Sequence, residues 1–274
     1  MAMTIGSLFS GVAGLELGLE VAGLGPVIWQ AERDPFCLAV LAKHYPNARR
    51  YTDVREIDAT TDRPDVICGG FPCQDLSLAG KQSGLSADRS GLWWEFRRIV
   101  RVLRPRFVVV ENVHGAWRKW LPVVRRGLWK VGYASLPLRV SADSVGADHE
   151  RNRVFVVAHA EGLRPDARRT GELRWLASVG DGNGHVRTHP DADRARELQP
   201  QRRLSDQWGR ASDGDGWAVE PVLRGSDYGD ARGLDRRAAS RHRAAREKAL
   251  GNAVVPQAAR EAWLTAMELT GWAP

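Results

Sequence analysis

The sequence predicts an α/β protein with a doubly wound, mostly parallel sheet. Short apolar runs with strand character alternate along the chain with segments of helical periodicity, and several runs end in a glycine turn or a polar residue. The run Phe107–Val110 is almost purely β-branched. This is typical of a central parallel strand that is buried on both faces.

Length and charge set the first limits. A chain of 274 residues suits one large domain with a smaller insert, and it can bury a sizeable core. The net charge of +7 favours a polyanionic partner, although a solvated basic surface explains it equally well. Nearly all of the positive charge is arginine, which matches phosphate groups and guanine edges better than lysine does.

Three cysteines, Cys37, Cys68 and Cys73, are too few for a disulfide framework, and no histidine pair joins them at zinc-site spacing. We therefore expect a reduced protein without a metal. The first residues lack a charged leader with a long apolar stretch, and no apolar run is long enough to span a bilayer. A soluble, cytoplasmic protein is expected.

A first strand–helix unit opens the chain. Thr4–Phe9 has strand character, Ser10–Gly14 is a glycine turn, and Leu15–Val21 is helix-like. Such a turn lets a ligand approach the main chain and leaves the amides of a helix N-terminus free, which suits a nucleotide-like cofactor. The spacing is not Gly-x-Gly-x-x-Gly, and an ordinary strand–helix turn explains it at least as well.

A second strand, Val27–Ala31, ends in Glu32 before a helix that opens at Asp34-Pro35. An acid at the tip of the second strand can accept hydrogen bonds from both hydroxyls of a ribose. Asp53 ends a third strand-like segment, Tyr51–Val54, where it could reach an adenine amino group. Either acid could instead cap a helix or be a surface charge.

The apolar run Asp65–Cys68 predicts a buried strand that ends in the loop Gly69–Gln74. Ligands collect outside the carboxyl ends of parallel strands, so Cys73 on this loop is the candidate nucleophile. A lone cysteine is more often a small buried hydrophobe, and we interpret Cys37 and Cys68 in that way. The polar segment Ser77–Ser90 is long enough to be a mobile lid.

The central strand Phe107–Val110 follows a helix that begins at Leu92, and it ends in Glu111-Asn112-Val113. A carboxylate at the carboxyl end of a buried strand is partly desolvated, which raises its pKa and equips Glu111 to donate a proton. A helix from about Ala116 to Val131 and two further strands, Ala134–Val140 and Arg153–Ala158, complete the alternation.

These motifs, in this order, resemble the cytosine-5 DNA methyltransferases. The cofactor loop of that family resembles Phe9–Gly14, its ribose- and adenine-binding acids fall on Glu32 and Asp53, and its Pro-Cys-Gln loop falls on Pro72-Cys73-Gln74. Its other three motifs fall on Glu111-Asn112-Val113, Arg151-Asn152-Arg153 and Gly251–Pro256. The resemblance covers residues 4–158 and 250 to about 265, and it leaves Gly162–Lys248 outside.

The resemblance implies a Rossmann-like methyltransferase fold with S-adenosylmethionine as cofactor and no metal. The catalytic residues that it implies are Cys73, Glu111, Arg151 and Arg153. The cofactor-binding residues that it implies are Phe9, Gly11, Gly14, Glu32, Asp53, Val54, Pro72, Leu92, Asn252 and Ala253. Phe71, Gln74 and Asn112 are the implied substrate-binding residues.

The resemblance further implies a DNA (cytosine-5)-methyltransferase. The Cys73 thiolate would add to carbon 6 of a flipped-out cytosine while Glu111 protonates or hydrogen-bonds ring nitrogen 3, and Arg151 would also hold the carbonyl oxygen of the base. Double-stranded DNA is the expected partner of a monomeric protein, prokaryotic or phage-encoded, with a cognate restriction endonuclease as a further partner. Two alternatives stay open, an RNA-directed relative and an idle relative that only binds DNA and cofactor.

We expect residues 1–158 with 249–274 to form the catalytic, cofactor-binding domain, and 159–248 to form a smaller, loop-rich target-recognition region. That region is rich in Arg, Asp and Gly, and disorder without DNA is an alternative. The chain departs from the family at Ala13, which replaces a glycine and is harmless only if φ is not positive there. It also departs at Asp148-His149, before Arg151, and in the Arg-rich run Arg241–Lys248.

Overall fold

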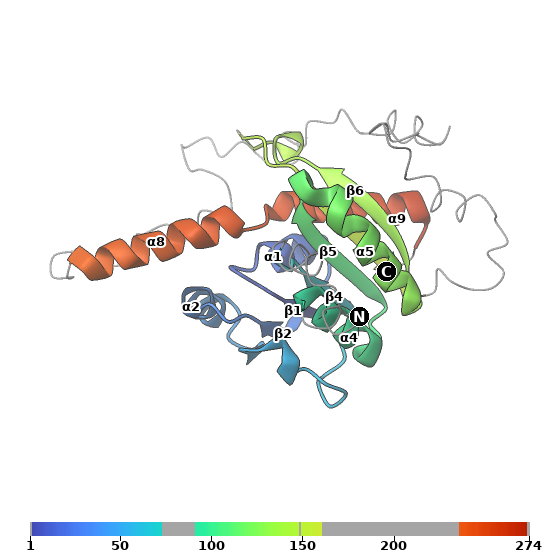
Figure 1. The fold of residues 1–274 in the computed structure, drawn as a ribbon, viewed down its shortest axis with the longest axis horizontal. Helices are drawn as coiled ribbons and strands as arrows, with labels where there is room; N and C mark the ends of the chain where they lie inside the picture. The colour runs from blue at the N-terminus through green and yellow to red at the C-terminus, as the bar shows by residue number, and fades with distance from the viewer. Residues whose placement is uncertain (1, 73–90, 148, 161–235, 273–274) are drawn as a thin grey trace, which may run out of the picture.

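One twisted sheet with helices on both faces forms the centre of the protein (Figure 1). The computed structural model describes residues 2–72, 91–147, 149–160 and 236–272, the last range with side chains from residue 243 onward. The seven strands are β1 (Ile5–Leu8), β2 (Val27–Ala31), β3 (Arg49–Tyr51), β4 (Val66–Gly69), β5 (Phe107–Val113), β6 (Ala134–Val140) and β7 (Arg153–His159). Their order is β3-β2-β1-β4-β5-β7-β6, which confirms the predicted doubly wound α/β class.

The sheet reverses direction at one strand only. The pairs from β3 across to β5 are all parallel, whereas β7 runs antiparallel to both β5 and β6. Residues 141–152 join β6 to β7, and those that the structure describes hold only the 3-10 turn η4 (Asp143–Val145). A parallel neighbour needs a longer crossover, usually through a helix, and the described part of this connection contains no α-helix.

Helices cover the sheet on both sides. The described α-helices are α1 (Gly14–Val21), α2 (Pro35–His44), α4 (Leu92–Leu103), α5 (Trp117–Lys130), α8 (Arg236–Asn252) and α9 (Pro256–Thr270). Successive residues of β5 serve opposite faces, since Val108 and Val110 join the core under α4 and α5 while Phe107 and Val109 join the core under α1 and α9. This two-sided burial explains the unbroken apolar run that predicted a central strand.

The C-terminal helix returns to the first unit of the chain. α9 packs along α1, and α1 presents glycine to the segment that precedes α9. A Cβ atom at Gly14 would lie 2.2 Å from the main-chain oxygen of Val254, so no other residue fits there without a shift of the backbone. The sequence motif at residues 251–256 therefore lies beside the glycine turn.

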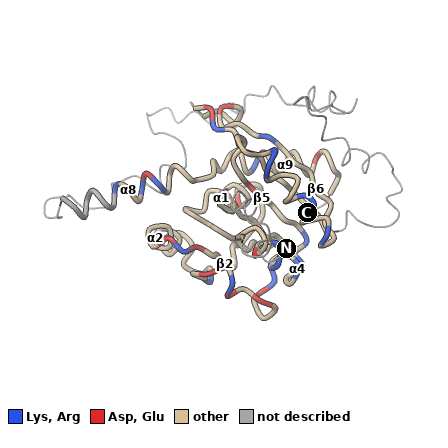
Figure 2. The backbone as a smooth tube through the Cα atoms, viewed as in Figure 1, with Lys and Arg blue, Asp and Glu red and all other residues tan. Residues whose placement is uncertain are grey.

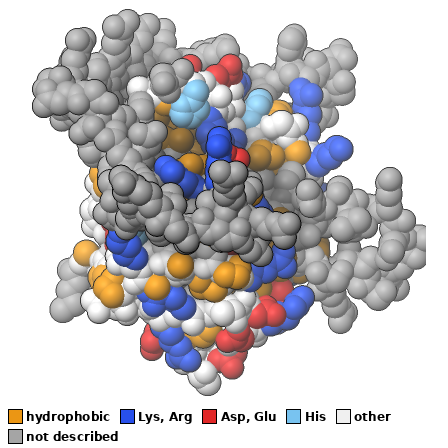
Figure 3. All heavy atoms as spheres, turned by 90° about the vertical axis from the view of Figure 1, so that its left-hand side faces the viewer, with side chains coloured by type: hydrophobic (Ala, Val, Ile, Leu, Met, Phe, Trp, Pro, Cys, Tyr) orange, Lys and Arg blue, Asp and Glu red, His pale blue; other side chains and the backbone are white. Residues whose placement is uncertain are grey.

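Lys and Arg occur on several elements along the backbone (Figure 2), and on the face shown in Figure 3 their side chains stand at several separate places. α5 contains Arg118, Lys119, Arg125, Arg126 and Lys130 and no acid. The described end of α8 adds Arg243, Arg246 and Lys248, against Glu247. Within the described ranges, no helix is both long and apolar enough to cross a membrane.

Candidate active site

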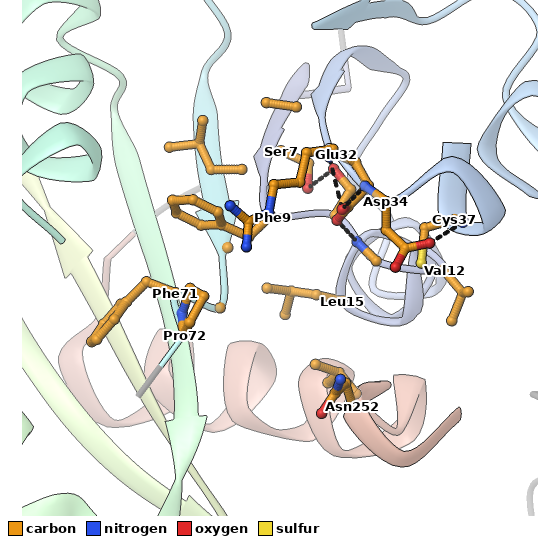
Figure 4. A pocket seen from close by; sticks show the side chains of 18 of the residues that line it. Ser7, Phe9, Val12, Leu15, Glu32, Asp34, Cys37, Phe71, Pro72 and Asn252 are labelled. Carbon is orange, nitrogen blue, oxygen red and sulfur yellow. Dashed lines mark hydrogen bonds between the residues drawn. The ribbon is translucent and has the colours of Figure 1, made fainter. Parts of the chain in front are cut away.

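A pocket of about 900 Å³ opens at the carboxyl ends of β1, β2, β4 and β5 (Figure 4). The chain passes from β1 outward to β3 and then returns to β4 on the other side of β1, so the pocket lies at the switch point of the sheet. Open α/β sheets bind their ligands at such points. All of the predicted cofactor-binding residues line it: Phe9, Gly11, Gly14, Glu32, Asp53, Val54, Pro72, Leu92, Asn252 and Ala253.

The glycine turn is built from residues in the left-handed region. Phe9 has φ 57°, and Ala13, the residue that precedes α1, has φ 68°. Alanine at residue 13 is harmless only if φ is not positive there, so it is not a harmless replacement for glycine. An L-residue in this conformation costs roughly 1–2 kcal/mol relative to glycine, because its Cβ crowds the following carbonyl oxygen.

Glu32 ties the tip of β2 to this turn. Its Oε2 accepts a hydrogen bond from the main-chain N–H of Gly11 at 2.8 Å, and its Oε1 accepts from the N–H groups of Arg33 and Asp34, each at 2.8 Å. A carboxylate oxygen has about two lone pairs, so Oε2 can accept one further donor. Glu32 is thus placed to accept a hydrogen bond from a ligand hydroxyl beside the glycine turn.

Asp53 caps a helical turn, which is one of the alternatives to cofactor binding that the sequence left open. It is the N-cap of η1 (Val54–Glu56): its side chain accepts from Arg55 N at 2.9 Å, and the side chain of Glu56 accepts from Asp53 N at 2.9 Å. The strand of this segment is Arg49–Tyr51, so Asp53 follows the strand rather than ending it. Asp53 also borders the pocket, where an adenine contact stays a prediction.

Glu111 and Arg153 form a buried ion pair on the other side of the pocket. Arg153 Nε lies 2.8 Å from Glu111 Oε1, and the two side chains are 15% and 9% exposed. Burial raises the pKa of Glu111 to about 7, although the positive charges of Arg153 and Arg151 oppose the rise. Both the position of this carboxyl at the end of β5 and the direction of its pKa shift agree with the sequence prediction.

The loop after β4 is fitted closely to this pair. A Cβ atom at Gly70 would lie 2.7 Å from Glu111 Oε2, so the carboxyl approaches the loop only because residue 70 is glycine. Asn112 donates from Nδ2 to the main-chain oxygen of Phe71 at 2.9 Å. The Phe71 ring is a core residue that packs against Trp93 and Trp120, so a substrate contact for Phe71 stays a prediction.

The loop presents Pro72 to the pocket, and Pro72 is the last described residue before Cys73. Cys73 and Gln74 themselves lie outside the described residues. The other two cysteines are buried, as the sequence predicted. Burial raises the pKa of Cys37 to about 12 and that of Cys68 well above its ordinary value, so neither thiol is appreciably ionised at neutral pH.

Arg151 contacts the C-terminal part of the chain, and a catalytic role for it stays a prediction. Its Nη2 donates to the main-chain oxygens of Gly251 and Ala253, at 2.6 and 2.8 Å. Glu111 and Arg153 both line the pocket, whereas Arg151 is not among the described residues that do. The two arginines of the predicted Arg-x-Arg motif therefore have different partners, although the charges of both act on the pKa of Glu111.

Two residues near the pocket were missed by the sequence reasoning. Lys248 lines the pocket and pairs with Asp34 at 3.1 Å. Glu16 is completely buried, and its Oε1 accepts a 3.4 Å hydrogen bond from Gln30 Nε2. Burial raises the pKa of Glu16 to about 7. Glu16 could have been identified from the sequence, because it is an acid in the first turn of a helix and both of its neighbours in the chain are apolar.

A pocket at the switch point of the sheet, beside a glycine turn, is typical of α/β proteins that bind nucleotides. The chain belongs to the C-5 cytosine-specific DNA methylase family, whose model matches residues 3–204. This match continues past residue 158 into the segment that we placed outside the resemblance, and it stops before Gly251.

Curated relatives agree with this placement. The chain is 35% identical over 164 residues to the Type II methyltransferase M2.BsuMI of Bacillus subtilis, a match that covers 57% of this chain and 42% of the relative. It is 34% identical over 183 residues to the Type II methyltransferase M.Eco47II of Escherichia coli, covering 64% and 43%. The chain thus spans about two fifths of the length of these relatives. The methyltransferase EhMeth of Entamoeba histolytica is 16% identical, with a TM-score of 0.49 over 58% of this chain and 53% of that one.

Proposed function

We propose that this protein is a DNA (cytosine-5)-methyltransferase that uses S-adenosylmethionine and acts through a covalent adduct of Cys73 with the target base. One observation carries the proposal: a single pocket holds the glycine turn with Glu32 on one side and the buried Glu111–Arg153 pair on the other. Family membership supports the same activity.

The pocket residues fit a nucleoside cofactor. The volume of about 900 Å³ is within the range of ligand pockets, roughly 300–1,000 Å³. Glu32 would accept a ribose hydroxyl, while Phe9, Val54 and Leu92 supply apolar surface for a base. Asn252 and Ala253 would close the far side. When bound, S-adenosylmethionine supplies an electrophilic methyl group.

The protein residues must activate the cytosine, because carbon 5 is a poor nucleophile. The Cys73 thiolate adds to carbon 6, Glu111 donates a proton or hydrogen bond to nitrogen 3, and the electron pair of the carbon 5–carbon 6 bond becomes available at carbon 5. After carbon 5 is methylated, loss of its proton restores the double bond and expels the thiolate. With a pKa of about 7, Glu111 is protonated in a large fraction of molecules at neutral pH, which suits a proton donor.

The thiolate also needs support, since only a few per cent of a cysteine with an ordinary pKa is ionised at neutral pH. Arg153 lines the pocket on the side where the loop leads to Cys73. We propose that this guanidinium and the amides of the loop favour the ionised thiol.

The target base must leave the duplex, which costs a few kcal/mol. We propose that residues 159–248 offset this cost through phosphate and groove contacts and read the target sequence, because this segment lies between the motifs of the resemblance and is rich in arginine. The names of the relatives, Type II methyltransferases, motivate the further proposal of a cognate restriction endonuclease as partner.

Bisulfite sequencing of DNA from cells that express the protein tests the activity. We expect protected cytosines in one sequence context, and none in cells that express the Cys73→Ser variant at the same level. The absence of protected cytosines in DNA, with folded wild-type protein present, would contradict the proposal. Protection in RNA instead would identify the RNA-directed alternative.

A further inference from the structure

One side of the pocket is formed by a short stretch from the C-terminal part of the chain, Lys248–Val254, which we name the closing segment. Lys248, Ala249, Asn252, Ala253 and Val254 line the pocket, and Asn252 lies across it from Glu32 (Figure 4). Two of these residues are predicted to bind the cofactor. The position of the closing segment therefore sets how well the cofactor is enclosed.

Arg151 holds the closing segment from the side of β7. α8 ends at Asn252, and the last carbonyl groups of a helix lack partners within the helix and carry its negative end. The Arg151 guanidinium meets this need, since Nη2 donates to Gly251 O at 2.6 Å and to Ala253 O at 2.8 Å. Arg151 thus caps α8 from a position 100 residues earlier in the sequence.

A second contact holds the closing segment from the side of α2. Lys248 Nζ lies 3.1 Å from Asp34 Oδ2, and Asp34 is also the N-cap of α2. The buried Ala249 belongs to a small apolar cluster with Val12 and Cys37. The segment is thereby fixed between the start of β7, the start of α2 and the glycine turn.

We propose that Arg151 and Lys248 are positioning residues that hold the closing segment ready for the cofactor. The inference rests on the proposed function. It assigns Arg151 to cofactor binding, whereas the resemblance implies that Arg151 contacts the target base. A segment that is already in place loses less conformational entropy when the ligand binds, so affinity increases. Arg151 should contribute more than Lys248, because the side chains of the Lys248–Asp34 pair are 69% and 31% exposed.

Calorimetry with S-adenosylhomocysteine on the full chain tests this role. Arg151→Ala should weaken binding by about ten- to a hundredfold, because two charge-assisted hydrogen bonds are lost. Arg151→Lys should recover part of the affinity, since one ammonium group can still donate to a carbonyl. Lys248→Ala should weaken binding about two- to fivefold. Lys130→Ala, at the far end of α5, is the matched control and should bind like wild type.

A second measurement separates positioning from contact with the base. With saturating S-adenosylmethionine and 5-fluorocytosine DNA, Arg151→Lys, which keeps the positive charge that acts on Glu111, should form the covalent adduct at a rate within about threefold of wild type. A large loss of that rate with unchanged S-adenosylhomocysteine affinity would overturn the proposal and return Arg151 to the base. If Arg151→Ala does not fold, unchanged affinity in both Arg151→Lys and Lys248→Ala overturns it. Wild-type protein that binds no S-adenosylhomocysteine would instead contradict the proposed function.

Discussion

The two sides of the pocket hold their glutamates in different ways. Glu32 receives three main-chain N–H groups at 2.8 Å, which fix both of its oxygens as acceptors beside the glycine turn. Glu111 is buried, pairs with Arg153, and has a pKa raised to about 7 by burial. The first arrangement suits a residue that holds a ligand, and the second suits a residue that moves a proton near neutral pH.

A third glutamate shows that a raised pKa alone does not identify the proton donor. Glu16 also has a pKa raised to about 7 by burial, and its Oε2 has no hydrogen-bond partner in the described structure. Glu16 belongs to α1, however, with its carboxyl beside Ser7 and Gln30 and not at the loop that leads to Cys73. Position relative to the reacting atoms distinguishes Glu111 from Glu16.

The largest expected effect concerns Glu111. Glu111→Gln keeps the shape of the side chain but cannot donate an acidic proton, so the covalent step should slow by roughly a hundred- to ten-thousandfold. Calorimetry should show unchanged cofactor affinity. Single-turnover trapping on 5-fluorocytosine DNA measures the rate, with Glu268→Gln, on the exposed face of α9, as the control. Equal trapping rates for Glu111→Gln and wild type would show that Glu111 is not the proton donor.

The next effect is on stability. The pKa of Glu16 is higher in the folded protein than the ordinary 4.5, so the folded state binds the proton more tightly and loses stability as the pH rises from about 4.5 to about 7. The loss for Glu16 is on the order of 3 kcal/mol. Glu16→Gln avoids it, and its amide can donate to Gln30 Oε1, which has no partner in the described structure.

Urea unfolding at pH 5 and pH 8 measures this effect. The gain in free energy of unfolding for Glu16→Gln over wild type should be larger at pH 8 than at pH 5. Glu268→Gln, on the exposed face of α9, is the control and should show no such difference. A gain of equal size at both pH values would show that folding does not raise the pKa of Glu16.

The smallest of the three effects concerns Glu32. Glu32→Gln replaces one acceptor oxygen with a donor, so cofactor affinity should fall by about ten- to a hundredfold. The trapping rate at saturating cofactor should remain close to that of wild type. Glu56→Gln, in the exposed cap of η1, is the control. If Glu32→Gln slowed trapping at saturating cofactor, Glu32 would act in catalysis as well as in cofactor binding, which contradicts the assignment of separate roles to the two sides of the pocket.

Local patterns predicted most of the fold. The strand–helix alternation and the two-sided burial of β5 follow from residue spacing alone. The reversed direction of β7 could not be predicted from residue spacing, because it depends on the connection from β6 and on the place of β7 in the sheet. α8 was also missed as a helix, since its Arg-rich sequence offers little apolar periodicity.

The site divides in the same way. The residues that we propose to bind the cofactor fall in ordered motifs of the sequence, and all of them line one pocket. The contacts of Arg151 with Gly251 and of Lys248 with Asp34 join residues 100 and 214 positions apart, so no local pattern could predict them. The positive φ at Ala13 was likewise hidden, because alanine does not signal a left-handed conformation.

The central claim is that the two sides of the pocket act on a base held by Cys73. DNA with 5-fluorocytosine at the target tests it most directly, because fluorine cannot leave as a proton does and the adduct persists after methyl transfer. We expect a denaturation-resistant adduct that requires S-adenosylmethionine, disappears in Cys73→Ser and persists in Cys37→Ala and Cys68→Ala. An adduct that survives Cys73→Ser, or none in wild type with a confirmed target and cofactor, would contradict the account.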